Sequence, residues 1–567
     1  MINVDDYAII KEGKAEILTP KEDKVFYNPI QQFNRDLSVM AINAYVQLRN
    51  EKFEAKQLQK LEKQKKTEET TETTNDVGAT AENEFETQKV QTSDEINSSK
   101  EEQNSKRRKV DLRAPKINIL EALSATGLRA IRYGHEIAQV NKIVANDLLA
   151  EAVKSIDRNI EYNKLNHVLH SNQGDAIKYM NSSGEKFHVI DLDPYGTATP
   201  FLDSAIQAIE EDGMLLVTCT DAGVLAGAGY PEKCFALYGG NNFGSAFINS
   251  EANHEAGIRL ILQMIASTAA KYKKSIEPML SLSIDFYFRL FIKVRTRPIE
   301  VKQLSSRTMI TYGCNGCGHK VLQPLGRVKG NKFQYPKLET VSSECRYCSS
   351  YYTVAGPMFL PPLHNHEFID RILKINSASD KNVYGTTERI KGMLTLAKNE
   401  LDAPFYFNLS SLASIFKSNP IPIQEFARAI GNAGYKLSLT HAKKNSVKTD
   451  APWETVLAIQ RAWLIDSNKK YLEDNKDKPD LTDKQKDKVN HLQEDIAYNG
   501  NLGDHSTGRK LLEYFASAGS TTSSDEINFK DDNDQSEQLH KLRKVKMVRY
   551  QENPTKNWGP KARPSSK

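Results

Sequence analysis

The four residues Asp193-Pro194-Tyr195-Gly196 directly follow the segment FHVIDL, which is typical of a buried strand. A carboxylate beside a prolyl carbonyl supplies two acceptors that can hold both N–H groups of an aromatic amine and direct its lone pair at an electrophile. The ring of Tyr195 offers a stacking face for a base. We therefore predict that Asp193, Pro194 and Tyr195 catalyse alkylation of an exocyclic amine, with Asp193 receiving the released proton. The alternative is a simple type I β-turn, which Pro194 and Gly196 also suit.

A turn of small residues earlier in the chain suits a nucleotide-type cofactor. In INILEALSATGLRAIR a strand ends near Ser124 and a helix begins after Gly127, so unpaired N–H groups at the helix start can face a ligand. Asp147 comes twenty residues after Gly127 and ends a second apolar run, where an acid can accept hydrogen bonds from ribose hydroxyls. Asp175 and Ala176 sit where a third strand would end, a position at which an adenine can be held.

Each of these residues also has an ordinary structural interpretation. Asp147 would then be a helix cap, Asp175 a turn residue, and Arg129 part of a solvated helix face. The recurrence of such residues after successive strands favours a cofactor site instead. A nicotinamide dehydrogenase would share these features, and only the motif at Asp193 after the fourth strand favours a methyltransferase.

Four of the six cysteines form two Cys-x-x-Cys pairs, Cys314 with Cys317 and Cys345 with Cys348, with 27 residues between the pairs. Four thiolates at this spacing suit tetrahedral zinc with no open position, which predicts a structural metal site. The alternative is four reduced core cysteines, but the surrounding sequence is polar and rich in glycine.

Short aliphatic runs alternate with helical stretches between residues 117 and 296, which predicts an α/β fold with a parallel sheet and a ligand at the carboxyl ends of its strands. The runs are INILEAL, KIVANDL, FHVIDLD, GMLLVTCT and LSLSIDFYFRLFIKV. Further along, SLASIF, IQEFARAIGNAGY and KLSLTHA are typical of helix, helix and strand, an order compatible with a winged helix. An unspecialised α+β domain is the alternative.

Two polar segments contain few apolar residues and are predicted to be disordered, residues 51–109 and 467–533. The apolar runs fall short of the ~20 residues that span a bilayer, so we expect no transmembrane segment. The first twenty residues contain four acids and no arginine, so we expect no N-terminal import presequence.

Positive charge is concentrated at the C-terminus, where residues 541–567 hold nine basic residues and one acidic residue. This segment carries a local charge of +8 in a chain of net charge +5, so the remainder is about −3. Tyr550 and Trp558 lie among these cations, a combination that predicts contact with RNA, although a solvated tail is the alternative. Residues 106–109, Lys-Arg-Arg-Lys, have the composition of a nuclear import signal.

These motifs together resemble those of the eukaryotic, especially fungal, tRNA (guanine-26 N2)-dimethyltransferases. The matching stretches are KEGKAEIL, VFYNPIQQFNRDLSV, NILEALSATGLRAIRY, HVIDLDPYGTATPF, YPEKCFALYGGNN, AAKYKKSIEPMLSLSIDFYFR, AGPMFLPPLHNHEFI and VRYQENPTKNWGPKARP. The resemblance implies a class I (Rossmann-like) methyltransferase domain that uses S-adenosylmethionine (SAM), followed by a C-terminal α+β domain with a zinc-binding subdomain. It also implies two successive methyl transfers to N2 of guanine 26 in tRNA.

The resemblance assigns roles to individual residues. It implies that Arg35 and Arg129 contact the carboxylate of the methyl donor, and that Asp193 and Pro194 orient the guanine amine. Asp147, Asp175 and Ala176 would hold the adenosine portion of the donor. Two alternatives remain open: a methyltransferase of another exocyclic or amide nitrogen, such as an adenine in DNA or a glutamine in protein, and a non-catalytic tRNA-binding protein.

The expected organisation has six parts. They are an N-terminal arm of the catalytic domain (1–50), a disordered charged insert (51–112), the methyltransferase core (113–298), a tRNA-binding domain with the four cysteines (299–466), a largely disordered polar segment (467–540) and a basic RNA-binding tail (541–567). The expected partner is tRNA, with no obligate protein partner. The expected location is the nucleus, and a mitochondrial pool stays open although no presequence is visible.

Overall fold

The computed structural model describes residues 3–21, 27–74, 114–338, 342–475, 478, 480–517 and 526–544. The chain divides into two units, one formed by Met1–Ala41 with Ile117–Lys567 and the other by Ile42–Lys116. The second unit contains the part of helix α1 (Gln32–Thr74) that follows Ala41. The predicted import signal at residues 106–109 and the basic tail beyond Lys544 lie outside the described residues.

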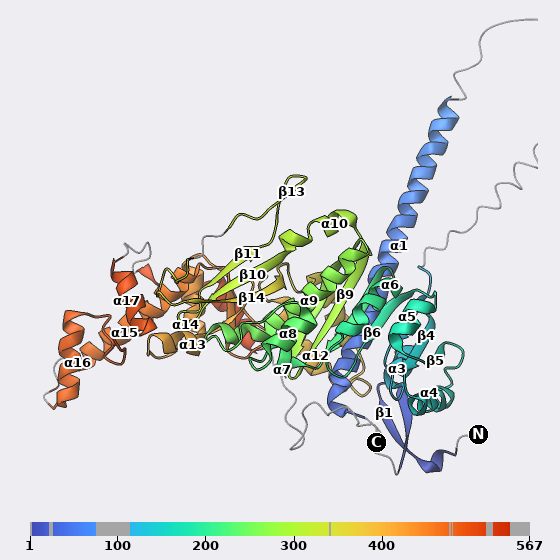
Figure 1. The fold of residues 1–567 in the computed structure, drawn as a ribbon, viewed down its shortest axis with the longest axis horizontal. Helices are drawn as coiled ribbons and strands as arrows, with labels where there is room; N and C mark the ends of the chain where they lie inside the picture. Colours follow the sequence, from blue (N-terminus) through green and yellow to red (C-terminus); the bar gives the residue numbers. More distant parts are fainter. Residues whose placement is uncertain are drawn as a thin grey trace, which may run out of the picture. The chain divides into compact units, whose positions relative to one another are not determined.

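A mixed sheet of seven strands forms the centre of the first unit (Figure 1). The strand order is β5-β4-β3-β6-β7-β9-β8, and in this sheet of described residues β9 runs antiparallel to the other six strands. The strands are β3 (Ile117–Glu121), β4 (Val140–Asp147), β5 (Leu169–Gln173), β6 (Phe187–Leu192), β7 (Ile209–Cys219), β8 (Lys274–Ile284) and β9 (Tyr287–Thr296).

The expectation of a wholly parallel sheet is therefore corrected at its last two strands. The run LSLSIDFYFRLFIKV is not one strand, because the chain turns back at Asp285, whose φ is 47°. The two halves pair antiparallel as β8 and β9. A tight hairpin of this kind needs only a short turn, and an apolar run without a glycine or proline hides it from sequence patterns.

The direction in which strands are added to the sheet reverses between β3 and β6. Helices α3 (Leu128–Glu136) and α4 (Ala150–Tyr162) pack on each other, whereas α5 (Ala176–Ser182), α6 (Leu202–Ala208) and α9 (Asn253–Lys271) form a second group. Because crossover connections are right-handed, the two groups cover opposite faces of the sheet. Ligands of such sheets bind at the carboxyl ends of the strands beside this reversal.

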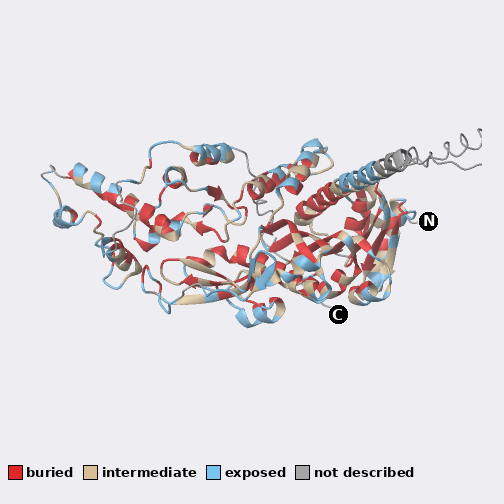
Figure 2. Ribbon diagram, turned by 90° about the horizontal axis from the view of Figure 1, so that it is seen from above, coloured by how far each residue is buried: buried red, intermediate tan, exposed pale blue. Residues whose placement is uncertain are grey.

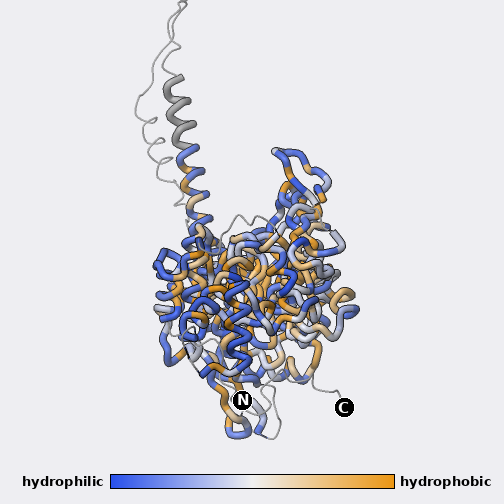
Figure 3. Tube along the Cα trace, turned by 90° about the vertical axis from the view of Figure 1, so that its left-hand side faces the viewer, coloured by the Kyte–Doolittle hydropathy of each residue, from blue (hydrophilic) through white to orange (hydrophobic). Residues whose placement is uncertain are grey.

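The strands between these helix layers are the most buried part of the unit, as Figure 2 shows in red. Their apolar side chains continue into the first strands of the next domain, where Met309 and Met358 join the same hydrophobic cluster. Hydrophobic residues accordingly gather in the interior of the trace in Figure 3. The sheet is thus a rigid support for the loops at its carboxyl edge.

An antiparallel hairpin near the N-terminus, β1 (Tyr7–Glu12) and β2 (Ala15–Pro20), packs on α3 and α4. Arg132 of α3 is completely buried and holds this contact together. One of its nitrogens, Nη1, lies 2.8 Å from Glu12 Oε1 and 2.6 Å from Asp36 Oδ1. Its Nη2 lies 2.9 Å from Glu136 Oε2. One arginine thus joins the hairpin, the start of α1 and α3.

The chain then forms an antiparallel three-stranded sheet of order β11-β10-β14, with a separate hairpin of β12 and β13. Two helices follow, and then a small sheet of order β15-β17-β16 with its own helices. The predicted order helix, helix, strand is confirmed by α13, α14 and β16. Strand β15 of the same small sheet precedes these three elements. The elements are β10 (Thr308–Cys314), β11 (Lys320–Pro324), β12 (Arg327–Lys329), β13 (Lys332–Gln334), β14 (Tyr352–Phe359), α11 (His366–Ala378), α12 (Thr387–Lys398), β15 (Phe407–Asn408), α13 (Leu409–Ile415), α14 (Ile423–Asn432), β16 (Leu437–Leu439) and β17 (Ser446–Thr449).

Both predictions of disorder are wrong for the residues that the structure describes. Residues 51–74 are helical as part of α1, because Glu, Lys and Gln have high intrinsic helix propensity even without an apolar face. The segment 467–540 holds the end of α15 (Trp453–Asn475) and three further helices, α16 (Asp483–Glu494), α17 (Thr507–Ser517) and α18 (Asp534–Lys544). Its few apolar residues, among them Leu511, Phe515 and Leu539, are buried in the hydrophobic cluster of the C-terminal domain.

Shorter elements complete the described chain. They are η1 (Val4–Asp6), η2 (Pro29–Gln31), η3 (Thr199–Phe201), α7 (Ala222–Leu225), α8 (Pro231–Tyr238), η4 (Asn249–Ala252), α10 (Pro298–Lys302) and η5 (Leu304–Arg307). None of the helices in the described ranges combines the length and the hydrophobicity that a membrane span requires.

We predict that Arg132→Met destabilises the catalytic domain, because it leaves the carboxylates of Asp36 and Glu136 buried without their cation and removes one of the two arginines that bind Glu12. Breaking such a buried cluster costs about 3–5 kcal/mol, so the melting temperature should fall by about 5 °C or more. Differential scanning calorimetry measures it. Lys154→Met, which removes an exposed ion pair with Glu151, is the matched control and should have almost no effect. Equal melting temperatures of the two variants would contradict the role given to Arg132.

Candidate active site

The predicted site residues follow four adjacent strands at the same edge of the sheet. The turn Ser124–Gly127 follows β3, Asp147 ends β4, Asp175 follows β5 and Asp193 follows β6. This edge lies at the reversal of strand order, where a ligand is expected. The structure therefore brings the catalytic motif and the cofactor motif to one place, as the sequence predicted.

Asn146, which sequence reasoning missed, ties these loops together. Its Nδ2 donates to the carbonyl of Ala122 at 2.9 Å and to that of Gly174 at 3.1 Å. Its Oδ1 accepts from Asn172 Nδ2 at 2.7 Å. The side chain thus joins the ends of β3, β4 and β5. The available signal was an amide side chain between the apolar run Ile143–Ala145 and Asp147.

Asp147 closes the turn that follows β3. Its Oδ2 accepts from the backbone N–H of Ala125 at 2.9 Å, and its Oδ1 accepts from the N–H of Leu149 at 3.0 Å. Gly127 sits at the start of α3 with a φ of 77°, a conformation that favours glycine. The predicted order of strand, small-residue turn and helix is confirmed here.

Asp175 caps helix α5, whereas its ordinary structural interpretation was a turn residue. Its Oδ1 accepts from the N–H groups of Ile177 at 2.8 Å and Lys178 at 3.2 Å. Ala176 is the buried first residue of the helix. Among the residues that the structure describes, no hydrogen bond reaches Asp175 Oδ2, and this oxygen is available to a ligand.

A buried carboxylate, Asp191, organises the charges behind the site. Arg289 of β9 binds it with two nitrogens, at 2.8 Å and 3.0 Å, and the hydroxyl of Tyr133 donates to it at 2.6 Å. Burial acts to raise the pKa of Asp191, but Arg289 and Arg129 outweigh it and lower that pKa. Asp191 is therefore an anion that must stay paired with its arginines. The sequence signal for the pair of Asp191 and Arg289 was the presence of a charged residue within each of the two largely apolar strands, β6 and β9.

Arg129 connects this buried pair to the catalytic motif. Its Nη2 donates to Asp193 Oδ2, its Nη1 lies 3.4 Å from Asp191 Oδ2, and its Nε lies 3.6 Å from Glu121 Oε1. The guanidinium is buried, so the interpretation as a solvated helix face is wrong. Ser38 Oγ accepts from Arg129 Nη1 at 3.2 Å and anchors the start of α1 to the cluster.

Glu121 lies behind the turn that follows β3. Its Oε2 accepts from Ser124 Oγ at 2.5 Å and from the N–H of Ala130 at 3.1 Å. Burial raises the pKa of Glu121 to about 8 against the opposing effect of Arg129. Near pH 7 this side chain is therefore mostly neutral. The negative charge of Asp191 is then compensated by Arg289 and Arg129.

The motif Asp193-Pro194-Tyr195-Gly196 forms a braced turn. The N–H of Gly196 donates to Thr220 Oγ1 at 2.7 Å, and the N–H of Thr220 donates back to the carbonyl of Gly196 at 2.8 Å. Pro194 is buried whereas Tyr195 is 46% exposed. Burial, Asp193 and Asp147 together raise the pKa of Tyr195 to about 12. The predicted catalytic acid and the predicted cofactor-binding acid thus both influence the same exposed ring.

Arg35 lies apart from this cluster, with the N-terminal hairpin. It donates from Nε to Glu12 Oε1 at 2.6 Å and from Nη2 to Glu12 Oε2 at 2.5 Å, and it lies over the ring of Tyr27. Within the described ranges it forms no hydrogen bond or ion pair with Asp147 or Asp193.

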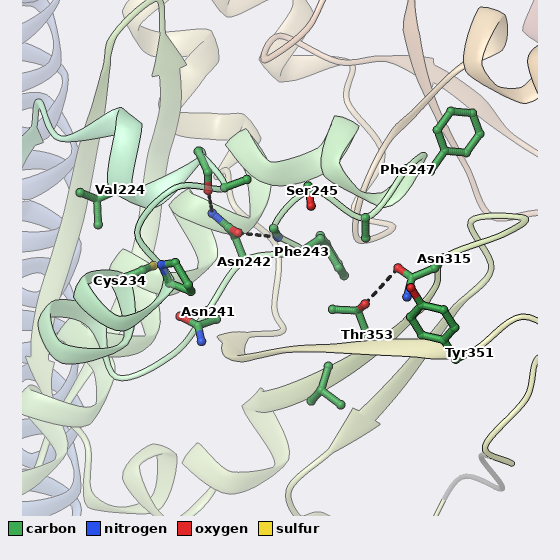
Figure 4. Close-up of a pocket in the computed structure, with 16 residues that line it drawn as sticks. Val224, Cys234, Asn241, Asn242, Phe243, Ser245, Phe247, Asn315, Tyr351 and Thr353 are labelled. Atoms are coloured by element: carbon green, nitrogen blue, oxygen red, sulfur yellow. Dashed lines mark hydrogen bonds between the residues drawn. The ribbon is translucent and has the colours of Figure 1, made fainter.

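A pocket of about 500 Å³ extends from the loops around α7 and α8 to the cysteine-bearing region (Figure 4). Asn242 shapes one wall by donating to the carbonyls of Leu225 and Gly227, both at 2.9 Å. The exposed rings of Phe247 and Tyr351 also line it. No predicted site residue lines this pocket, and sequence patterns gave no signal for it.

The four cysteines converge into one buried cluster. The Sγ atoms of Cys314 and Cys348 lie 3.5 Å apart, and those of Cys317 and Cys345 lie 3.7 Å apart. All four sulfur atoms lie within 4.8 Å of one another. Tetrahedral zinc with bonds of about 2.3 Å places its sulfur ligands about 3.8 Å apart. The predicted grouping is confirmed, and the cluster has the geometry to hold a metal ion.

A second group of residues could in principle bind a metal ion, but it is better explained as a structural network. The group consists of His364, Glu400 and His441. His441 Nε2 accepts from the N–H of Ser283 at 3.2 Å, so its proton must be on Nδ1, which donates to Glu400 at 2.6 Å. A protonated Nδ1 cannot bind a metal. The ammonium of Lys448, 3.1 Å from Glu400 Oε1, already supplies a positive charge.

The sheet order, the reversal at β3 and β6, and the acids at the carboxyl edge define a class I, Rossmann-like methyltransferase fold with an added cysteine-bearing domain. Comparison with known proteins makes the assignment specific. The family described as N2,N2-dimethylguanosine tRNA methyltransferase matches residues 6–461.

Proteins named tRNA (guanine(26)-N(2))-dimethyltransferase are similar along most of the chain. The Saccharomyces cerevisiae protein, designated mitochondrial, is 48% identical over 100% of this chain and 94% of its own length. The Schizosaccharomyces pombe protein is 39% identical over 99% of this chain and 93% of its own. The human protein is 35% identical over 80% of this chain and 68% of its own length. The chain therefore belongs to the N2,N2-dimethylguanosine tRNA methyltransferase family.

A solved archaeal structure supports the fold. It is Trm1 from Pyrococcus horikoshii in complex with S-adenosyl-L-methionine, 24% identical, with a TM-score of 0.58. The match covers 80% of this chain and 99% of the archaeal chain, so the shared fold includes the C-terminal domain.

We predict that Glu121 makes stability depend on pH. Its folded pKa of about 8 lies above its ordinary value of 4.5, so its stabilising contribution is complete below about 4.5 and is lost as the pH rises to about 8. Glu121→Gln stays neutral throughout. The melting temperature of the variant minus that of the wild type should therefore increase from pH 5 to pH 8 and then level off, which differential scanning fluorimetry can follow. Glu185→Gln, at a partly exposed site, is the control, and a difference independent of pH would disprove the assignment.

Proposed function

We propose that this chain transfers two methyl groups in succession from SAM to N2 of guanine 26 in tRNA, and that Asp193 is its catalytic carboxylate. The proposed reaction is supported by the membership of the chain in the family. The observation that carries the residue assignment is the contact between Arg129 and Asp193 at the reversal of the sheet, beside the turn closed by Asp147.

The amino group of guanine is a weak nucleophile, because its lone pair is delocalised into the ring. Asp193 and the carbonyl of Pro194 accept its two N–H groups and hold the lone pair in line with the methyl group. Tyr195 stacks on the base once the base has left its helix. SAM supplies an electrophilic methyl group. After each transfer the nitrogen is cationic, and Asp193 accepts its proton.

Asp147, Asp175 and Ala176 hold the adenosine portion of the donor in this proposal. Three features support it: the turn closed by Asp147, the free Oδ2 of Asp175, and the helix start after Gly127. The archaeal relative of the same fold was solved with SAM bound. Arg35 and Arg129 are proposed to contact the donor carboxylate, and Arg129 additionally positions Asp193.

We assign a structural zinc ion to Cys314, Cys317, Cys345 and Cys348. Their spacing and buried sulfur geometry support this assignment. The site also anchors its surroundings, because Trp453 Nε1 donates to the carbonyl of Cys317 at 3.1 Å.

The C-terminal domain and the basic tail bind tRNA in this proposal, and the tail remains a prediction from the sequence. The two alternative functions, methylation of another nitrogen and binding without catalysis, are disfavoured by the extent of the family match. For location we propose a nuclear pool that depends on residues 106–109. The designation of the Saccharomyces relative supports a mitochondrial pool as well.

We predict that Asp193→Ala abolishes most methylation without abolishing donor binding. Loss of one preorganised acceptor should lower kcat by about 100-fold or more. The assay incubates the protein with SAM and an unmodified tRNA carrying guanine 26, followed by mass spectrometry of nucleosides for N2,N2-dimethylguanosine. Asp147→Asn is the comparison: it should raise the KM for SAM and leave kcat at saturating SAM nearly unchanged. If Asp193→Ala retains full kcat, Asp193 is not catalytic, and if the wild type forms no methylated guanosine, the proposed reaction is wrong.

We predict that about one zinc ion per chain is lost in the double variant Cys314→Ser, Cys348→Ser, as measured by inductively coupled plasma mass spectrometry. The C-terminal domain should then melt at lower temperature, because the cysteines belong to its hydrophobic cluster. Binding of SAM, measured by calorimetry, should persist. Cys219→Ser, at a buried cysteine outside the cluster, is the control and should keep its zinc. Unchanged zinc content in the double variant would refute the site.

A further inference from the structure

We propose that the hairpin of residues 325–338, here called the basic hairpin, is a tRNA-binding arm that contacts phosphates away from the target guanine and stacks Tyr335 on an unpaired base. The inference rests on the proposed function for the identity of the RNA. The hairpin contains β12 and β13 and extends beyond β10 and β11 in Figure 1.

The charge of the basic hairpin has one sign. It contains Arg327, Lys329, Lys332 and Lys337 and no acidic residue, so it contributes +4 to a chain of net charge +5. All four side chains are exposed. Within the described part of the chain none of them forms an ion pair with a carboxylate. Their charge is therefore available to an anion.

The register of the hairpin sorts its residues onto two faces. Lys329 pairs directly with Lys332, and Val328 pairs with Phe333. Because side chains alternate along a strand, Arg327, Lys329 and Lys332 share one face, and the apolar pair occupies the other. Two lysines directly opposite each other repel, which destabilises a hairpin unless an anion lies between them. A phosphate is an anion that several cations can share.

Aromatic and apolar side chains are exposed on the same arm. Tyr335 is 93% exposed, and Leu338 and Phe333 are also exposed. The tube in Figure 3 accordingly mixes hydrophilic and hydrophobic residues where this hairpin projects. Cations interleaved with exposed rings are typical of surfaces that bind RNA strands, because phosphates meet the cations while bases stack on the rings.

Packing does not account for this composition. At the base of the hairpin, Gln323 Nε2 donates to the carbonyl of Lys337 at 3.0 Å, and a side chain at Gly326 would collide with Ser305. The tip at Gly330 has nothing within 4 Å of the position of an added Cβ. The base is therefore anchored, while the exposed strands contribute little to the core. Their residues are free to serve a binding role.

The test measures binding of unmodified tRNA by fluorescence anisotropy at several salt concentrations. We expect the triple variant Arg327→Gln, Lys329→Gln, Lys332→Gln to lower the slope of log K against log salt by about 2–3, since each phosphate contact contributes about 0.7–0.9. Steady-state kinetics should show a raised KM for tRNA and an unchanged kcat. Tyr335→Ala should weaken binding by about tenfold with little change in slope, because stacking is not ionic.

The matched control is Lys154→Gln, Lys164→Gln, Lys271→Gln, which removes the same charge from exposed positions of the catalytic domain and should leave the slope near that of the wild type. Zinc content and SAM affinity of the hairpin variant should equal those of the wild type, which excludes misfolding. An unchanged slope and KM in the hairpin variant would overturn the proposal. So would intact tRNA binding combined with lost binding of a polyglutamate peptide, which would assign the arm to an acidic protein. Failure of the wild type to methylate would instead count against the proposed function, because the salt slope is measured without SAM.

Discussion

The arrangement of the site depends on the pairing of one buried carboxylate, Asp191. A carboxylate without water must be compensated by cations and donors, and Asp191 receives Arg289, Arg129 and the hydroxyl of Tyr133. These partners come from β9, α3 and, through Ser38, the start of α1. The requirement to neutralise one charge therefore fixes segments that are more than 200 residues apart in the chain.

A second buried network joins the C-terminal domain to the catalytic sheet. The ammonium of Lys448 lies 3.0 Å from Glu255 Oε2 of α9 and 3.1 Å from Glu400 Oε1. His441 continues the network to the N–H of Ser283 at the edge strand β8. An unpaired sheet edge would attract other strands, and here side chains of the next domain occupy part of it. The same contacts hold the C-terminal domain, which we propose to bind tRNA, against the catalytic sheet.

The sequence predicted those features that are local. The turn before Gly127 and the motif after β6 depend on residues close in the chain, and the cysteine pairs are recognised by spacing alone. The partners of Arg129 were not predictable, because Glu121, Asp191 and Asp193 meet it only after the strands have assembled. The helix in residues 51–74 was not predicted, because the prediction of disorder rested on the scarcity of apolar residues that could be buried. The intrinsic helix propensity of the residues decides the conformation of such an exposed segment.

The segment Ile190–Asp193 explains how one strand can supply both internal support and the carboxylate that we propose to be catalytic. Asp191 lies within β6, and Asp193 directly follows Leu192, the last residue of that strand. The side chain of Asp191 is 0% exposed, whereas that of Asp193 is 24% exposed, and Arg129 contacts both. The inner acid cannot reach a substrate and serves to hold the arginine. The outer acid, fixed by that arginine at the end of the strand, is the one that a base can reach.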